Sequence, residues 1–173
     1  AATKAIDEIY GSVFKICYGM ETIGLRYFNI FGPRQDPNGA YAAVIPKFIN
    51  LMKKRKRPTI NGDGTFSRDF TFIDNAVQAN FLALTTDRAE CFGQAFNIGA
   101  GGRFSIMELF NIIKKELDLD MEPIFGDKRA GDIPHSNADI SKAKNMLGYD
   151  PLVLFEEGII RTIKFYCKTK IKK

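Results

Sequence analysis

The chain of 173 residues has few of the residues from which metal centres, disulfide frameworks and membrane spans are built. Its three cysteines, Cys17, Cys91 and Cys167, lie far apart, and no C-x-x-C pair occurs. This spacing argues against a zinc site or a disulfide framework and favours a reducing, cytoplasmic setting. We expect each cysteine to be a small buried or half-buried residue. No apolar run approaches the roughly 20 residues of a membrane helix, so we expect no membrane association.

Histidine is nearly absent, and His135 is the only one. A histidine can act as the general base of a hydrolase, but a serine nucleophile needs the sharp turn that a G-x-S-x-G sequence provides, and the chain has none. We therefore interpret His135 as a residue of a pocket wall. The first residues read as a helix and lack the charged start and apolar middle of a signal peptide, so we expect the sequence to begin inside a larger protein.

Positive charge is concentrated in two places, although the net charge is only +5. Residues 53–57 are all lysine or arginine, and further lysines load residues 168–173. Because residues 44–52 read as an amphipathic helix, we interpret the first run as the solvated end of that helix, where cations favour the helix dipole. A basic RNA-binding module is the alternative. No nucleic-acid motif accompanies the charges, and we expect no nucleic-acid partner.

Apolar periodicity and turn residues predict alternating helices and strands, which is the pattern of the α/β class. Helices are predicted over 3–17, 44–57, 74–84, a segment that starts at Ser105, 141–147 and 154–167. Strands are predicted over 22–29, 59–61, 68–70, 94–98 and 122–125. Asp74 is expected to cap its helix, and Ser105 with Glu108 has the spacing of a capping box. Residues 99–102 are interpreted as a tight turn, because a dinucleotide loop would follow the first strand of a βαβ unit.

Several separated motifs resemble one known family. The segment Leu25–Gln35, with Lys4 one helix upstream, is similar to the second half of extended short-chain dehydrogenases/reductases, the family of nucleotide-sugar epimerases and dehydratases. Residues 62–69 match its G-x-G-x-x-x-R-D pattern, and residues 129–132 match its R-x-G-D pattern. The resemblance implies the C-terminal part of a Rossmann-type fold. Residues 1–35 would finish the NAD-binding domain, 36–173 would form mainly the substrate domain, and 68–104 would partly return to the Rossmann sheet.

The resemblance also implies a cofactor side of the site, and NAD is the cofactor it implies. In the family a catalytic Tyr stands four residues before a Lys, and the cation lowers the pKa of the phenol. At Lys4 this places the Tyr one position before Ala1, so we expect this chain to lack it together with the glycine-rich NAD loop. Lys4 would hold the nicotinamide ribose. Tyr27 and Phe28 would pass beneath the nicotinamide ring.

A second set of residues is implied to bind a nucleotide sugar. Arg68 would make charged hydrogen bonds to the diphosphate, which a planar guanidinium does well, and Asp69 is expected to orient a backbone or a neighbouring arginine. Ser136 is small where many glucose-only epimerases have a large aromatic, which would leave room for an N-acetyl group. The substrate-binding residues implied by the resemblance are Asn29, Ala43, Val44, Thr59, Asn61, Arg68, Arg129, Asp132 and Ser136.

Together these motifs imply an NAD-dependent 4-epimerase of UDP-sugars that oxidises C4 transiently. The segment Arg34–Tyr41 is most similar to UDP-N-acetylglucosamine 4-epimerases. An ADP-heptose 6-epimerase or a UDP-glucose 4-epimerase is the alternative within the family. A non-catalytic nucleotide-sugar-binding fragment is the alternative of another class, and we expect the isolated chain to be inactive. The resemblance further implies a homodimer, through the helix that carries Lys4, and no metal.

Overall fold

The computed structural model describes residues 2–38, 43–128 and 131–168. The helices are α1 (Ala2–Tyr18), α2 (Val44–Lys53), α3 (Ile73–Thr85), α4 (Ile106–Glu116), α5 (Ser141–Leu147) and α6 (Phe155–Lys168), with the short 3-10 helix η1 (Ala89–Cys91). The strands are β1 (Ile23–Tyr27), β2 (Ile30–Phe31), β3 (Thr59–Asn61), β4 (Ser67–Arg68), β5 (Thr71–Phe72), β6 (Gln94–Ile98), β7 (Phe104–Ser105), β8 (Ile124–Gly126) and β9 (His135–Ser136).

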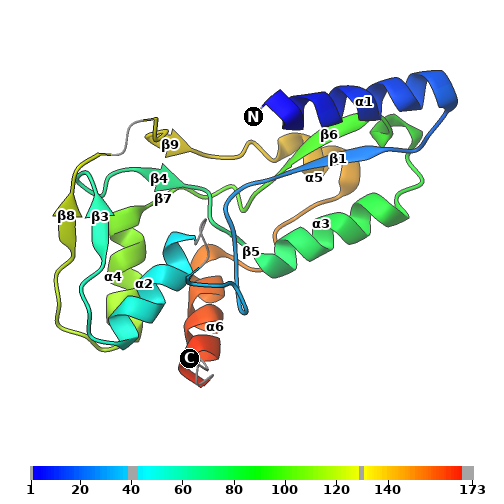
Figure 1. Cartoon of the computed structure of the whole chain (residues 1–173). Helices are drawn as coiled ribbons and strands as arrows, with labels where there is room; N and C mark the ends of the chain where they lie inside the picture. Colours follow the sequence, from blue (N-terminus) through cyan, green and yellow to red (C-terminus); the bar gives the residue numbers. More distant parts are fainter. Residues whose placement is uncertain (1, 39–42, 129–130, 169–173) are drawn as a thin grey trace.

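One part of the molecule is a parallel pair of strands between helices. β1 and β6 run in parallel from Ile23 opposite Gln94 to Tyr27 opposite Ile98. α1 lies on one side of this pair and α3 on the other (Figure 1). α5 packs against β6 and α3, and its residues share a small core with the strand residues Phe96 and Ile98. This arrangement of helix, parallel strands and helix is the layering of a doubly wound α/β sheet.

The other part contains the larger core, formed under α2, α4 and α6. Three small sheets surround it: β2 with β5, β3 with β8, and the three-stranded sheet β7-β4-β9. Phenylalanines fill its centre, and Phe155 stacks on Phe104 with ring centroids 4.1 Å apart. The chain enters this part through β2, directly after β1, and returns to the first part through α3. The carboxyl end of β1 therefore lies where the two parts meet.

The first part leaves apolar surface exposed. β1 pairs only with β6 among the described residues, so its other edge carries no strand. α1 has no buried residue, and its apolar side is largely exposed at Ile6, Ile9, Tyr10, Val13 and Phe14. Exposed apolar side chains also follow α3, at Val77, Phe81 and Leu84. Exposed apolar side chains on two helices, together with an open strand edge, favour an interaction site in this part of the molecule.

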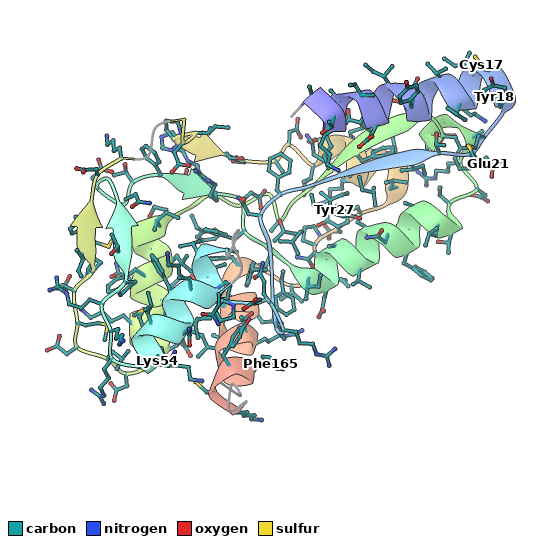
Figure 2. All side chains as sticks on the ribbon, in the orientation of Figure 1. Cys17, Tyr18, Glu21, Tyr27, Lys54 and Phe165 are labelled. Carbon is teal, nitrogen blue, oxygen red and sulfur yellow. The ribbon has the colours of Figure 1, made fainter. Side chains whose placement is uncertain are left out.

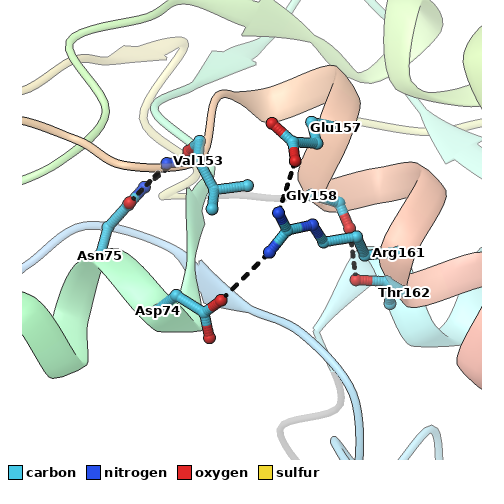
Figure 3. A network of polar contacts seen from close by, with 7 residues as sticks. All are labelled: Asp74, Asn75, Val153, Glu157, Gly158, Arg161 and Thr162. Atoms are coloured by element: carbon cyan, nitrogen blue, oxygen red, sulfur yellow. Dashed lines mark hydrogen bonds and ion pairs between the residues drawn. The ribbon is translucent and has the colours of Figure 1, made fainter.

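A polar network fixes the C-terminal segment onto α3 (Figure 3). The buried Asn75 amide donates to the Val153 carbonyl at 2.7 Å and accepts from the Val153 N–H at 2.9 Å. Arg161 of α6 pairs with Asp74 at 3.3 Å and with Glu157 at 2.5 Å. The two bonds of Asn75 satisfy both the carbonyl and the N–H of Val153, as a neighbouring β-strand would. They bring Val153, and with it Phe155, into the larger core.

Most predicted elements are present, with three differences in detail. The helix predicted over 44–57 ends at Lys53, because Arg55 has a left-handed backbone with φ 53°. The basic run is also only partly solvated, since the Lys53 ammonium donates to the Tyr166 carbonyl and Arg57 donates to the carbonyls of Glu122 and Pro123. Lys54 lies at the end of α2 in Figure 2.

The second difference is that Asp74, which was expected to cap its helix, does not cap α3. The residue before the helix is Phe72, which makes no side-chain cap, and Asp74 lies in the first turn and pairs with Arg161. An anion in that turn still favours the helix dipole. The capping box of Ser105 and Glu108 is confirmed, and α5 ends at the left-handed Gly148 with φ 69°.

The third difference concerns strands and cysteines. Only Arg68 of the strand predicted over 68–70 lies in a strand, because Asp69 and Phe70 connect β4 to β5, which belong to different sheets. The strand predicted over 22–29 ends at Tyr27. Only Cys91 is buried, whereas Cys17 and Cys167 are exposed, so the expectation for those two was wrong. Figure 2 shows Cys17 and Tyr18 at the outer end of α1.

Candidate functional site

A cavity of about 280 Å³ opens where the end of β1 meets the larger core. Side chains from β2, α2, β3, β4 and the loop before β9 converge on it. Its walls contain most of the residues expected to bind a nucleotide sugar: Asn29, Ala43, Val44, Thr59, Asn61, Arg68 and Asp132. These residues are far apart in the sequence, so the fold brings them together.

Arg68 is held at the cavity by the backbone. Its Nη1 donates to the carbonyls of Ser67 at 2.8 Å and Pro134 at 3.3 Å. Its Nη2 lies 3.8 Å from Oδ1 of Asp132. The structure gives Nε and Nη2 no hydrogen-bond partner among the described residues. A guanidinium fixed through one nitrogen, with other donors left over, is suited to an anion such as a phosphate.

Asn29 stands at the turn between β1 and β2 with φ 23°, a positive value that asparagine tolerates better than most residues. Its carbonyl accepts from the Thr71 N–H at 3.2 Å. This bond fixes the turn while the exposed side chain lines the cavity. The strand end therefore delivers an amide to the same cavity as Arg68.

The start of α2 and strand β3 form the opposite wall. Ala43 precedes α2 without any side-chain cap, so the N–H groups of Val44 and Ile45 can serve a ligand, whereas Pro46 has no N–H and Lys47 donates to the Ala43 carbonyl. Thr59 and Asn61 are two residues apart on β3 and therefore share one face of the strand. Lys47, Phe48 and Phe66 also line the cavity. None of these three was named as a binding residue from the sequence, although Lys47 follows Val44 by one helical turn and could have been found from that spacing.

The residues expected to hold the cofactor lie at a different place. Lys4 and Tyr27 line a groove of about 710 Å³ between α1 and β1. The Tyr27 hydroxyl donates to Asn80 of α3 at 3.0 Å, and Figure 2 shows Tyr27 near the end of β1. The Lys4 side chain is 86% exposed, with its ammonium 3.7 Å from Asp7. Phe28 lines neither space; it is half-buried, and its N–H donates to the Ile98 carbonyl at 2.9 Å.

Two further expectations have a mixed outcome. Ser136 is not among the residues that line the cavity, but it stands opposite Arg68 in the parallel pair β4–β9. His135 is exposed and also lies outside the lining of this cavity. Its Nδ1 lies 2.9 Å from the Ser67 hydroxyl. Arg129 and the segment 39–42 are outside the described residues.

Asp69 follows Arg68 and organises the loops behind it. Its carboxylate is fully buried and accepts from the N–H groups of Ala100 at 2.8 Å, Gly101 at 3.0 Å and Ala138 at 3.3 Å. The expectation that Asp69 orients a backbone is therefore confirmed, as is a backbone role for the turn at 99–102. Gly99 is required beside it, because a Cβ there would lie 2.6 Å from the carboxylate. Burial raises the pKa of Asp69 above its ordinary value, despite these three bonds.

The part of the chain that the structure describes contains no group of three or more histidine, cysteine, aspartate or glutamate side chains that could hold a metal ion. None of its helices is both long and apolar enough to cross a membrane.

The parallel strands, their covering helices and a polar cavity at the strands' carboxyl ends define an α/β protein with the layering of a doubly wound fold. A family model described as the NAD dependent epimerase/dehydratase family matches residues 1–99. The chain belongs to this family, and its fold is part of a Rossmann-type short-chain dehydrogenase/reductase fold.

Individual relatives agree with this assignment. The chain is 38% identical over 163 residues to a putative UDP-glucose 4-epimerase of Methanocaldococcus jannaschii. This match covers 94% of this chain and 51% of the relative. It is also 34% identical to the UDP-glucose 4-epimerase of Mycolicibacterium smegmatis. That match covers 96% of this chain and 52% of the relative. The chain thus spans about half the length of the curated relatives it matches.

A solved structure is similar over the same extent. The UDP-N-acetylglucosamine 4-epimerase of Methanobrevibacter ruminantium, in complex with UDP-N-acetylmuramic acid, matches with a TM-score of 0.89 and 40% identity. The match covers 96% of this chain and 53% of that one.

Proposed function

We propose that this chain is the nucleotide-sugar-binding portion of an NAD-dependent UDP-sugar 4-epimerase. The observation that carries the proposal is the convergence of Asn29, Arg68 and Asp132 on one cavity with the start of α2. An arginine and free helix N–H groups suit a diphosphate. A carboxylate suits the ribose hydroxyls, since one anion accepts from two donors. Relatives that act on UDP-glucose, and one solved with a UDP-sugar, support uridine diphosphate as the ligand class.

The groove with Lys4 and Tyr27 supports NAD as the cofactor. It is large enough for part of a dinucleotide, it lies beside the same strand end as the cavity, and it contains the cation that the resemblance assigns to the ribose. When bound, NAD supplies reversible acceptance of a hydride. Lys4 would fix the ribose and lower the pKa of a nearby phenol, and Arg68 would hold the nucleotide while the sugar turns. The open edge of β1 and the exposed apolar side chains of α3 support a further strand beside β1.

A direct test uses the 173-residue chain with no addition. We expect it to bind UDP and UDP-sugars, with dissociation constants below about 1 mM by isothermal titration calorimetry, and to bind ADP more weakly. We expect no interconversion of UDP-sugar epimers when NAD is supplied, because Asp7, at 3.7 Å, and no tyrosine hydroxyl is the partner of the Lys4 ammonium among the described residues. Absence of UDP binding would contradict the proposed function. Preference for ADP over UDP would favour an ADP-heptose 6-epimerase, and turnover would refute the proposed inactivity.

The sugar is a finer question, and Ser136 is our candidate for its determinant. Because Ser136 stands opposite Arg68 in β9, a large side chain there would extend over the face of the sheet that carries Arg68. We expect Ser136→Tyr to weaken binding of UDP-N-acetylglucosamine about tenfold relative to UDP-glucose, since only the former needs room at C2. Competition titrations with both ligands measure this ratio. An equal loss on both would remove Ser136 from the proposal.

A homodimer is also part of the proposal. The apolar side of α1 supports it, because Ile9 and Tyr10 are among its most exposed residues and a helix–helix contact would cover them.

A further inference from the structure

A side-chain hydrogen bond lies behind the strand that carries Arg68. Ser67 and Arg68 are neighbours in β4, so their side chains point to opposite faces of the sheet. His135 stands opposite Ser67 in the parallel pair of β4 and β9, and its Nδ1 lies 2.9 Å from the buried Ser67 hydroxyl. This contact therefore joins the two strands on the face away from the Arg68 side chain.

The direction of this bond follows from the other partner of the hydroxyl. Nε of Arg103 donates to Oγ of Ser67 at 2.9 Å, and an arginine nitrogen can only donate. The hydroxyl hydrogen is then left for Nδ1 of His135, which is its one remaining partner among the described residues. A buried hydroxyl hydrogen without an acceptor would cost free energy. Nδ1 is therefore the acceptor, which requires a neutral imidazole with its hydrogen on Nε2.

The bond matters for the cavity because the pairing of β9 with β4 is short. Each strand contains two residues. The backbone bonds that join them include those from the Ser67 N–H to the Pro134 carbonyl and from the Asp69 N–H to the Ser136 carbonyl, both at 2.9 Å. The Pro134 carbonyl also accepts from Nη1 of Arg68 at 3.3 Å. A shift of β9 would therefore move an acceptor that holds the guanidinium.

We propose that His135 is a positioning residue for nucleotide binding: by accepting from the Ser67 hydroxyl, it holds β9 on β4 and keeps Arg68 in place at the cavity. The proposal rests on the proposed function of the cavity and adds to it a residue outside the cavity lining. Asp132 stands three positions before His135, so the same bond also helps to fix the segment that faces Arg68 across the cavity.

The first test determines the state of the imidazole. His135 is the only histidine, so a long-range proton–nitrogen correlation spectrum of the 173-residue chain shows one imidazole ring. We expect Nδ1 to be the unprotonated nitrogen at about pH 8, where an ordinary histidine is neutral. Its signal should move in Ser67→Ala, which removes the donor. A wild-type ring protonated at Nδ1, or an Nδ1 signal unchanged by Ser67→Ala, would overturn the proposal whether or not the chain binds UDP.

The second test measures UDP binding by calorimetry. We expect His135→Leu to weaken it about fivefold, the share of one ordinary hydrogen bond. His135→Asn should stay within about twofold of the wild type, because its amide oxygen can accept near the place of Nδ1. Ser67→Ala should lose about as much as His135→Leu, and the double variant no more than either, since both substitutions remove the same bond. Ser67→Ala alone supplies the comparison if His135→Leu does not fold.

Arg103→Gln is the control, since it removes the other partner of the same hydroxyl and leaves the bond to His135. UDP affinity should then change less than about threefold. A fivefold loss in this variant as well, or additive losses in the double variant, would attribute the effect to general disturbance around Ser67 and overturn the proposal. Unchanged UDP binding in both His135→Leu and Ser67→Ala would also overturn it, while leaving the proposed function intact. Failure of the wild-type chain to bind UDP would remove both.

Discussion

Substituting Arg68 with glutamine is expected to weaken UDP binding about 100-fold. Arg68 is the guanidinium that the cavity holds ready for an anion, fixed through Nη1 and with donors remaining on Nε and Nη2. Charged hydrogen bonds to phosphate contribute about 1.5–3 kcal/mol each, so two of them at the lower end of this range account for a loss of this size. Calorimetry on the folded variant measures it. Arg68→Lys should recover only part of the affinity, because an ammonium cannot reproduce the planar, two-pronged contact.

Arg103→Gln provides the control for this prediction. Arg103 is exposed, its Nε donates to the Ser67 hydroxyl at 2.9 Å, and it lies outside the cavity lining. The substitution Arg103→Gln therefore removes one positive charge close to β4, as Arg68→Gln does. We expect UDP affinity to change less than about threefold, as for a screened surface charge. Equal losses for both arginines would mean that the affinity depends on net charge, and the cavity would then not be the diphosphate site.

Local signals in the sequence were sufficient for much of this fold. The capping box of Ser105 depends on two residues three positions apart, and the end of α5 depends on one glycine. Such features are decided within one turn of helix, so short windows of sequence predict them correctly. The helix that starts near Val44 was found for the same reason, through its apolar spacing.

The region of residues 67–72 could not be predicted in this way. A run of β-favouring residues suggested one strand, whereas the chain changes sheets between Arg68 and Thr71. The cause is non-local, because the carboxylate of Asp69 is drawn to N–H groups about 30 and 69 residues further along the chain. The pairing of Ser67 with His135 is equally distant in sequence. Periodic patterns of apolar residues in the sequence do not reveal contacts between residues that are this far apart.

The candidate site shows the same division. From the family motifs in the sequence, Asn29, Arg68 and Asp132 were predicted to bind one ligand, and all three line one cavity. Lys47 and Phe66, which line it too, were not named as binding residues from the sequence, because Phe66 stands at a variable position of the G-x-G-x-x-x-R-D pattern and Lys47 is not one of the small residues at the start of α2. The loose pairing of Arg68 with Asp132 likewise depends on a distance, which a sequence does not contain. Motifs therefore identified the chemistry, and the fold determined how its charges interact.

The largest expected loss of stability comes from Asp69→Asn. Asparagine can keep the bond from Ala100, but its NH₂ group would face the N–H groups of Gly101 and Ala138, which now donate to Oδ2. Two buried donors without acceptors cost about 3 kcal/mol, which for a chain of this size lowers Tm by about 6–12 °C. Thermal unfolding followed by circular dichroism measures the shift. Asp120→Asn, which alters an exposed carboxylate, should stay within about 0.5 kcal/mol of the wild type.

The effect of Asp69→Asn should also depend on pH, in a direction opposite to that of most carboxylates. Because burial raises the pKa of Asp69 in the folded chain, the folded state binds a proton that the unfolded state releases. Stability from this group is thus fully present below the unfolded pKa of about 3.9 and is lost as pH rises through the folded value. Asparagine does not titrate, so the stability advantage of the wild type over the variant should grow as pH falls from about 7 toward 4. An advantage that shrinks on acidification would mean that the three N–H groups stabilise the carboxylate more than burial destabilises it, and that its pKa is lowered.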